Sequence, residues 1–328
     1  MPRVRLGVVG TGVIGAGWTV RALSLGHHVV ATDPQPGAET RLRAFVDRAW
    51  PAVQELGVAD GADPERLEFV AGVAELGPVG FVQESVPERL ELKQTVLAEI
   101  DEVVPPEVII ASSTSGLLPT DLQARCRHPH RLVVGHPFNP VYLLPLVEVV
   151  AGEATSDESV EAAQAFYRDL AMHPLLVRHE IEGFLSDRLQ EALWREVLHL
   201  VNDGIATTDE LDRAIVHGPG LRWAAMGTNM IFHLAGGDGG LRHMLDQFGP
   251  ALELPWTRLV APELTPDLID RMVDGTEAQA AGRTIAELER LRDDYLIGVM
   301  RALEPVGVGA GEVLAQRREL IEPQTADE

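Results

Sequence analysis

The sequence predicts an α/β protein in which a doubly wound sheet is followed by an all-α domain. Between residues 4 and 178, short apolar strand patterns alternate with amphipathic helix patterns, which is typical of a mostly parallel sheet with helices on both faces. After Gly183 the strand patterns stop, and apolar residues recur only at helical spacing. A length of 328 residues also favours two domains over a single core.

The individual elements follow from apolar periodicity and from glycine and proline breaks. Strands are expected at 4–9, 28–32, 67–70, 80–84, 108–112, 132–136, 146–150 and 175–178, and helices after Gly10 and at about 37–56, 88–103 and 156–172. The second half is expected to hold helices at 185–201, from a cap at Thr208, at 228–249 with a break at 236–240, and at 266–303. We therefore place the domains at 1–182 and 183–322, and we expect residues 323–328 to be a disordered tail.

A glycine-rich turn follows the first predicted strand directly and opens a helix. Gly10 suits the tight turn, Gly12 lets the backbone approach a pyrophosphate, and Gly15 lets the helix pack on the strand. The N-terminus of the helix then receives the negative charge of the phosphates. This context predicts a Rossmann-like dinucleotide site formed by Gly10, Thr11, Gly12, Val13, Ile14 and Gly15.

The end of the second predicted strand indicates which dinucleotide binds. Asp33 stands about twenty residues after the glycine turn, where a carboxylate accepts hydrogen bonds from ribose hydroxyls. No arginine follows at residues 34–36 to hold a 2′-phosphate. The sequence therefore predicts NAD rather than NADP as the cofactor.

His136 is the natural general base of the chain, because an imidazole accepts a proton from a hydroxyl at neutral pH without large tuning. Glu148 follows the apolar run 143–147. If that run returns antiparallel to the strand of His136, the carboxylate reaches the second ring nitrogen, fixes the tautomer and stabilises the imidazolium. Taken alone, each residue fits an ordinary turn or strand end. Taken together, they predict a base and its orienting partner.

Composition argues against several classes of partner. A formal net charge of −23 argues against binding to nucleic acids or anionic membranes, since both need a basic surface. The single cysteine, Cys126, permits no intrachain disulfide and makes a reducing compartment the default. No apolar leader precedes the first strand, and no run of about eighteen apolar residues occurs. We therefore expect a cytoplasmic enzyme with a small-molecule substrate, no membrane span and no metal site.

A serine- and threonine-rich motif at 112–116, the motif Gly-His-Pro-Phe-Asn-Pro at 135–140 and then Glu148 resemble the site of the L-3-hydroxyacyl-CoA dehydrogenases. The resemblance covers the first domain and the first helix of the second. It implies that His136 is the base, that Glu148 is its partner and that the protein is a homodimer. It further implies that Ser115 contacts both the substrate and the nicotinamide and that Asn139 makes another contact at the active centre. Cofactor contacts are implied for Glu88 and for Lys93, which is the only lysine of the chain.

The second domain departs from the pattern of that family. Asp187 stands where the family has an asparagine that points into the active site, and residues 218–227 differ from the family's usual glycine- and proline-rich segment. The glycine- and lysine-rich ending that is common in the family is also absent. These differences argue against a CoA thioester as the substrate.

The segments at 187–196, 222–223 and 248–257 are similar to the carnitine 3-dehydrogenase branch of the family, which oxidises L-carnitine with NAD. A quaternary ammonium group is held by aromatic faces and a nearby anion. The resemblance thus implies that Asp187 with Trp223 or Trp256 holds the cation and that Arg222 holds the carboxylate of the substrate. Alternatively, the tryptophans are core or interface residues, and Asp187 pairs with an arginine.

Three other functions fit the same motifs. The first is a 3-hydroxybutyryl-CoA dehydrogenase, and the second is an L-gulonate 3-dehydrogenase. The third is a noncatalytic NAD-binding protein similar to λ-crystallin, although an intact pair of His136 and Glu148 argues against it.

Overall fold

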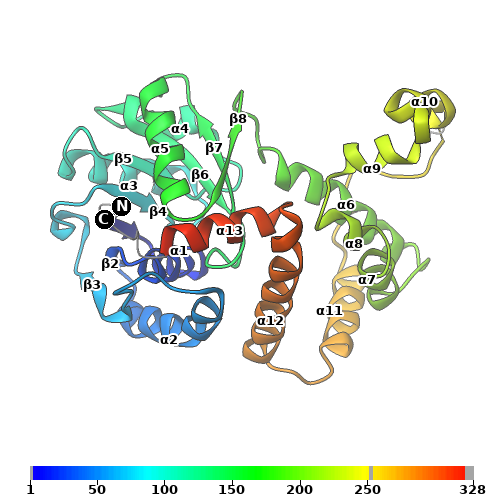
Figure 1. Ribbon diagram of the computed structural model, residues 1–328, viewed down its shortest axis with the longest axis horizontal. Coiled ribbons are helices and arrows are strands. Elements are labelled where there is room, and N and C mark those ends of the chain that lie inside the picture. The colour runs from blue at the N-terminus through cyan, green and yellow to red at the C-terminus, as the bar shows by residue number, and fades with distance from the viewer. Residues whose placement is uncertain (1–2, 251–253, 322–328) are drawn as a thin grey trace, which may run out of the picture. The chain divides into compact units, whose positions relative to one another are not determined.

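The computed structural model describes residues 3–250 and 254–321 (Figure 1). The chain divides into two compact units. The first contains the chain up to Leu185 together with the chain from Val313 onward, and the second is Ser186–Glu312. The sequence predicts the domain boundary at 182/183 and a helical domain that extends to 322. The structure differs mainly at the C-terminal end, because it assigns the chain from Val313 onward to the first unit. The expected tail at 323–328 lies outside the described residues.

The first unit is built on one eight-stranded sheet with the order β3-β2-β1-β4-β5-β6-β7-β8. Neighbouring strands are parallel, except that β6 and β7 pair antiparallel. The predicted strands are all present, with bounds that move by at most about two residues, as is usual for element ends. They are β1 (Arg5–Val9), β2 (His28–Thr32), β3 (Leu67–Val70), β4 (Phe81–Glu84), β5 (Ile109–Ser112), β6 (Leu132–Pro137), β7 (Leu146–Ala151) and β8 (His173–Val177).

Helices connect the strands and cover the sheet, as expected for a doubly wound α/β fold (Figure 1). The strands are apolar along almost their whole length because both of their faces are buried. The helices of this unit are α1 (Val13–Ser24), α2 (Ala38–Leu56), α3 (Leu90–Val103), α4 (Pro119–Gln123) and α5 (Asp157–Asp169). Short 3₁₀ turns occur at η1 (Pro64–Arg66), η2 (Val73–Glu75) and η3 (Pro129–Arg131).

The second unit is helical in its described residues. Its helices are α6 (Ser186–Asn202), α7 (Thr208–Val216), α8 (Pro219–Trp223), α9 (Thr228–Ala235), α10 (Gly240–Phe248), α11 (Pro266–Ala280) and α12 (Ile285–Leu303), with 3₁₀ turns at η4 (Gly237–Gly239) and η6 (Glu304–Val306). Helix α11 packs on α6 and α7, and α9 packs on α10. Helix α13 (Ala310–Ile321) then continues from this unit into the first one.

Two local predictions for this unit were wrong, both because of helix capping. Thr207 rather than Thr208 is the N-cap of α7, since Thr207 forms a reciprocal capping box with Glu210. The run 266–303 is broken into two helices, because Thr284 and Glu287 form a second capping box that starts α12. Among the described residues, no helix is both long and apolar enough to cross a membrane.

Candidate active site

The glycine turn between β1 and α1 is shaped for close approach of a ligand. Gly10 has φ of 90°, and a Cβ there would lie 2.7 Å from the carbonyl of Ser85. A Cβ on Gly15 would lie 1.9 Å from the Gly10 oxygen, so the helix can pack here only without a side chain. Gly12, the N-cap of α1, has open space around its Cα and supplies no side-chain cap. The first turn of α1 is therefore suited to a pyrophosphate.

Asp33 follows β2 and lies directly beside this turn. Its Oδ2 accepts hydrogen bonds from the amide and the hydroxyl of Thr11, at 2.9 and 3.1 Å, and its Oδ1 accepts from the amide of Gln35 at 2.9 Å. Asp33 thus holds the glycine turn in place. Because each carboxylate oxygen has two lone pairs, Asp33 can still accept hydrogen bonds from ribose hydroxyls. The residues at the turn therefore fit NAD.

His136 and Glu148 face each other across the antiparallel pair of β6 and β7. The imidazole Nδ1 lies 2.9 Å from Glu148 Oε2, and the two side chains are 5% and 0% exposed. Glu148 Oε1 accepts a second hydrogen bond from the amide of Leu185 at 3.0 Å. The antiparallel return expected from the sequence is present, and it places the carboxylate against one ring nitrogen.

Aromatic rings surround the imidazole and limit its movement. The rings of Phe138 and Phe184 have their centroids 4.8 and 5.6 Å from that of His136. Phe184 is fully buried and adopts φ of 46° at the end of the first unit. A fixed carboxylate and flanking rings give the imidazole a defined orientation, which a general base requires.

Ser115 and Asn139 lie just beyond the carboxyl ends of the neighbouring strands β5 and β6. Both residues are exposed. In open α/β sheets, ligands bind outside the carboxyl ends of the strands. Ser115, Asn139 and the glycine turn therefore share the edge of the sheet where a cofactor and substrate are expected.

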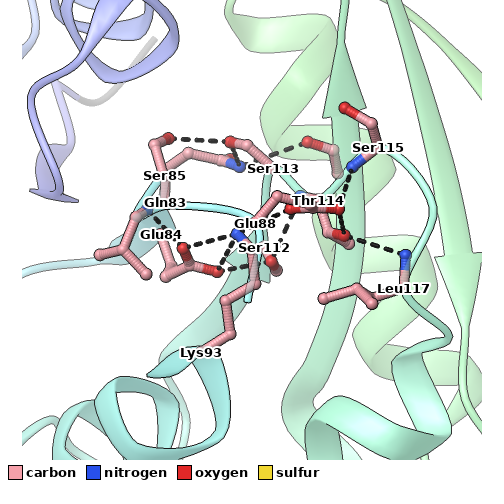
Figure 2. A network of polar contacts seen from close by, with 12 residues as sticks. Gln83, Glu84, Ser85, Glu88, Lys93, Ser112, Ser113, Thr114, Ser115 and Leu117 are labelled. Atoms are coloured by element: carbon pink, nitrogen blue, oxygen red, sulfur yellow. Dashed lines mark hydrogen bonds and ion pairs between the residues drawn. The ribbon is translucent and has the colours of Figure 1, made fainter. Parts of the chain in front are cut away.

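Lys93 lies behind this edge in a polar network (Figure 2). Its side chain is 1% exposed, and its Nζ lies 2.9 Å from Glu84 Oε1 and 3.4 Å from Glu88 Oε2. Glu88 Oε1 accepts from the amide of Ser115 at 3.0 Å and from the hydroxyl of Thr114. Glu88 is thus placed beside the predicted site, whereas the ammonium group of Lys93 is enclosed by protein. Sequence reasoning missed Glu84, whose only signal is an acidic residue at the end of an apolar strand.

Asp187, predicted to contact substrate, lies in the second unit at the start of α6, where Gln190 Nε2 donates to its Oδ1 at 3.1 Å. It lines a cavity of about 530 Å³ between α6 and α7. The indole in this cavity is that of Trp194, rather than that of Trp223 or Trp256, the two tryptophans expected to hold the cation. Arg222, Trp223 and Trp256 are all exposed. The described lining consists of Asp187, Gln190, Glu191, Leu193, Trp194, Val197, Leu211, Asp212, Ile215 and Val216.

Comparison with known proteins agrees with the geometry of both units. The family described as 3-hydroxyacyl-CoA dehydrogenase, NAD binding domain, matches residues 5–181, and the corresponding C-terminal domain matches residues 183–281. An L-carnitine dehydrogenase of Pseudomonas aeruginosa is 58% identical over 94% of this chain and 96% of its own. An L-carnitine dehydrogenase of Bacillus cereus is 55% identical over 92% of this chain and 93% of its own.

Among solved structures, an NAD-dependent 5-formyl-3-hydroxy-2-methylpyridine 4-carboxylic acid 5-dehydrogenase is similar at 26% identity. It matches with a TM-score of 0.77 over 92% of this chain and 99% of its own. The NAD-binding family matches the first domain, and the relatives align over both domains. These matches confirm the resemblance drawn from the motifs. The chain belongs to the 3-hydroxyacyl-CoA dehydrogenase family and is an NAD-dependent oxidoreductase.

Proposed function

We propose that the protein oxidises the C3 hydroxyl of L-carnitine to the ketone of 3-dehydrocarnitine with NAD. The observation that carries the proposal is the 58% identity to an L-carnitine dehydrogenase over 94% of the chain. This similarity extends through the helical domain, where the sequence departs from the usual pattern of the family. It therefore favours carnitine over a CoA thioester.

His136 is proposed as the general base. Its Nε2 takes the proton of the C3 hydroxyl, while the hydrogen on C3 leaves as a hydride. NAD, when bound, supplies the hydride acceptor. Glu148 lies at Nδ1 and stabilises the imidazolium as it forms, and the Leu185 amide keeps the carboxylate in place. Base catalysis of this kind is worth about 10²- to 10⁴-fold in rate. Ser115 and Asn139 contact the substrate at the same edge of the sheet.

The cavity between α6 and α7 is proposed to receive the trimethylammonium group. A quaternary ammonium cannot donate a conventional hydrogen bond, so an aromatic face and carboxylates are its natural partners, with about 0.5–2 kcal/mol for each cation–π contact. The cavity offers the indole of Trp194 and the carboxylates of Asp187, Glu191 and Asp212. Trp194 thus replaces Trp223 and Trp256 as the proposed aromatic wall, and Arg222 remains the proposed partner of the substrate carboxylate.

The proposal is tested by following NAD reduction with L-carnitine, 3-hydroxybutyryl-CoA and L-gulonate side by side. We expect the highest kcat/KM with L-carnitine. A higher value with either of the other substrates would assign the enzyme to that activity, and absence of turnover with all three would remove the proposed function.

We also propose that the protein is a cytoplasmic homodimer that associates through its helical unit. Support comes from the large apolar side chains that this unit exposes, among them Leu189, Leu221 and Val260. Burying such side chains between two copies would remove apolar surface from water.

A further inference from the structure

We propose that Glu84 is a positioning residue for NAD binding. Its buried carboxylate holds Lys93, Lys93 holds Glu88, and Glu88 holds the loop that bears Ser115. The inference rests on the proposed cofactor contacts of Glu88 and Ser115, but it does not depend on which alcohol is oxidised.

Glu84 occupies the junction between the two loops of the cofactor site. It is the last residue of β4, which lies between β1 and β5, and it is in register with Val9 and Ser112. The glycine turn leaves β1 directly after Val9, and the loop with Ser115 leaves β5 directly after Ser112. A group at the end of β4 can therefore influence both loops.

The carboxylate of Glu84 is fully buried and fully used by the protein. Oε1 accepts from the amide of Val86 at 2.6 Å and from Lys93 Nζ at 2.9 Å. Oε2 accepts from the hydroxyl of Ser112 at 2.5 Å and lies 3.3 Å from Lys93 Nζ. With an exposed fraction of 0%, Glu84 cannot touch the cofactor itself. Charge-assisted hydrogen bonds of this number fix the position of the lysine instead.

Lys93 connects the buried Glu84 to an exposed residue of the site. Its ammonium group lies between Glu84 and Glu88, and Glu88 is the exposed member, with 46% of its side chain accessible. The same Glu88 carboxylate accepts from Thr114 and Ser115, as Figure 2 shows. The chain of contacts thus runs from a buried strand end to the loop that faces the cofactor.

Glu84→Gln removes the charge but keeps the size of the side chain. Lys93 then has Glu88 as its remaining carboxylate partner in the network, so Glu88 is drawn toward the ammonium and away from Ser115. In metal sites, loss of a residue that orients a ligand weakens binding about 10- to 100-fold, and we take the lower end of that scale here. We expect the Kd of NAD, measured by calorimetry without any alcohol substrate, to rise by about 10-fold.

A double-mutant cycle separates this role from a general effect on folding. Lys93→Met alone should also weaken NAD binding, and adding Glu84→Gln to Lys93→Met should change the Kd by no more than about 2-fold, because the group through which Glu84 acts is gone. If the two effects instead multiply, Glu84 does not act through Lys93 and the proposal is overturned.

The matched control is Asp101→Asn, which breaks another buried ion pair on the same helix, α3. Asp101 Oδ1 lies 2.7 Å from Arg131 Nη2, and both side chains are 1% exposed. This variant should lower the Tm but leave the Kd of NAD within about 2-fold of wild type. If Glu84→Gln behaves in the same way, its role is structural only and the proposal is wrong.

Glu84→Asp keeps the charge and retracts it by one methylene group, so it provides a measurement if Glu84→Gln does not fold. It should weaken NAD binding by a smaller factor than Glu84→Gln and lose that effect in the Lys93→Met background. An unchanged Kd in folded Glu84→Asp would contradict the proposal. Failure of L-carnitine turnover would leave these NAD measurements intact, so the two proposals can fail separately.

Discussion

At the scale of the residue, the sequence predicts best those groups whose chemistry is tied to a local motif. His136 and Glu148 could be paired in advance because they lie close in the sequence on consecutive strands, and the antiparallel ladder then places them opposite each other. Glu84 could not be found in this way. Its partners Ser112 and Lys93 come from other elements, and only the register of β4 with β5 brings them together.

The first prediction concerns the base and its partner. His136→Ala or Glu148→Gln should lower kcat by at least about 10²-fold, the scale of losing a general base, with little change in the Kd of NAD. Steady-state kinetics and NAD titration test this. His173→Ala, an exposed histidine at the start of β8, is the control and should keep normal turnover. Near-normal kcat in either site variant would rule out the mechanism.

Cofactor preference follows from Asp33. A 2′-phosphate would lie against its carboxylate, and like charges placed side by side at an interface cost several kcal/mol. We expect kcat/KM with NADP to be at least about 10²-fold below that with NAD, which corresponds to about 2.7 kcal/mol. Equal activity with the two cofactors would show that Asp33 does not discriminate against the 2′-phosphate of NADP.

Recognition of the cation is tested at Asp187. Asp187→Asn should raise the KM for L-carnitine by about 10-fold, because an anionic partner of the trimethylammonium group is lost. The KM for an uncharged 3-hydroxy acid and the Kd of NAD should stay unchanged. Trp194→Leu should act in the same direction. Asp209→Asn, at a partly exposed residue of α7 that pairs with Arg213, should have no effect. An unchanged carnitine KM in Asp187→Asn would show that this carboxylate does not contact the cation.

At the scale of the element, the side chain of Arg21 links helix α1 to the connection from β6 to β7 by hydrogen bonds. Its guanidinium donates to the carbonyls of Val141, Leu144, Leu170 and Ala171, at 2.7 to 3.1 Å. Burial, with the nearby charge of Arg317, lowers the pKa of Arg21 to about 9. The helix of the glycine turn is thus tied to the hairpin of His136 and Glu148. An arginine in a helical pattern gives no sequence signal of this role, since its acceptors are backbone groups more than a hundred residues away.

The junction before β2 gives a prediction on pH. His27 is 5% exposed, and its Nδ1 accepts from the amide of Val4 at 3.1 Å. Burial lowers the pKa of His27 below its ordinary value, so the folded protein keeps the ring neutral while the unfolded chain takes up a proton. The free energy of unfolding should therefore fall as the pH drops below the ordinary histidine pKa.

Urea unfolding at about pH 7 and about pH 5 measures this effect, which is expected as a lower free energy of unfolding at the lower pH. His27→Gln, whose amide oxygen can accept from Val4, should lose that part of the pH dependence. His28→Ala, at the exposed neighbouring residue, should retain it. The same pH dependence in His27→Gln and wild type would contradict the assignment.

At the scale of the whole molecule, the alternation of strands and helices predicts the first domain, but it does not predict where the C-terminal helix belongs. Arg317 of α13 is 3% exposed and donates to the Gly57 carbonyl and the Ser24 hydroxyl, at 2.9 to 3.1 Å. These acceptors lie at the ends of α2 and α1, where a cation is favoured by the helix dipoles. A local helical pattern at 310–321 carries no information on such distant partners. The sequence alone therefore places this segment with the helical domain that precedes it.

The distribution of apolar surface argues for association of two chains. Of the large apolar side chains that are exposed in the described residues, only Val13, Val103, Leu176 and Leu185 lie in the first unit. The others lie on the second unit, and association of two copies would remove such side chains from water. A net charge of −23 on each chain opposes association, and salt screens that repulsion.

We therefore expect a homodimer at micromolar concentration, with a dimer Kd that falls as the ionic strength rises, because an apolar interface gains from screening of the like charges. Light scattering across a dilution series at low and high salt measures both effects. Leu189→Glu, which places a charge on exposed apolar surface of α6, should shift the equilibrium toward monomer. Val103→Glu makes the same change on the first unit and should leave the dimer intact. A monomer at both salt concentrations would show that the apolar face of the second unit does not join two copies of this chain.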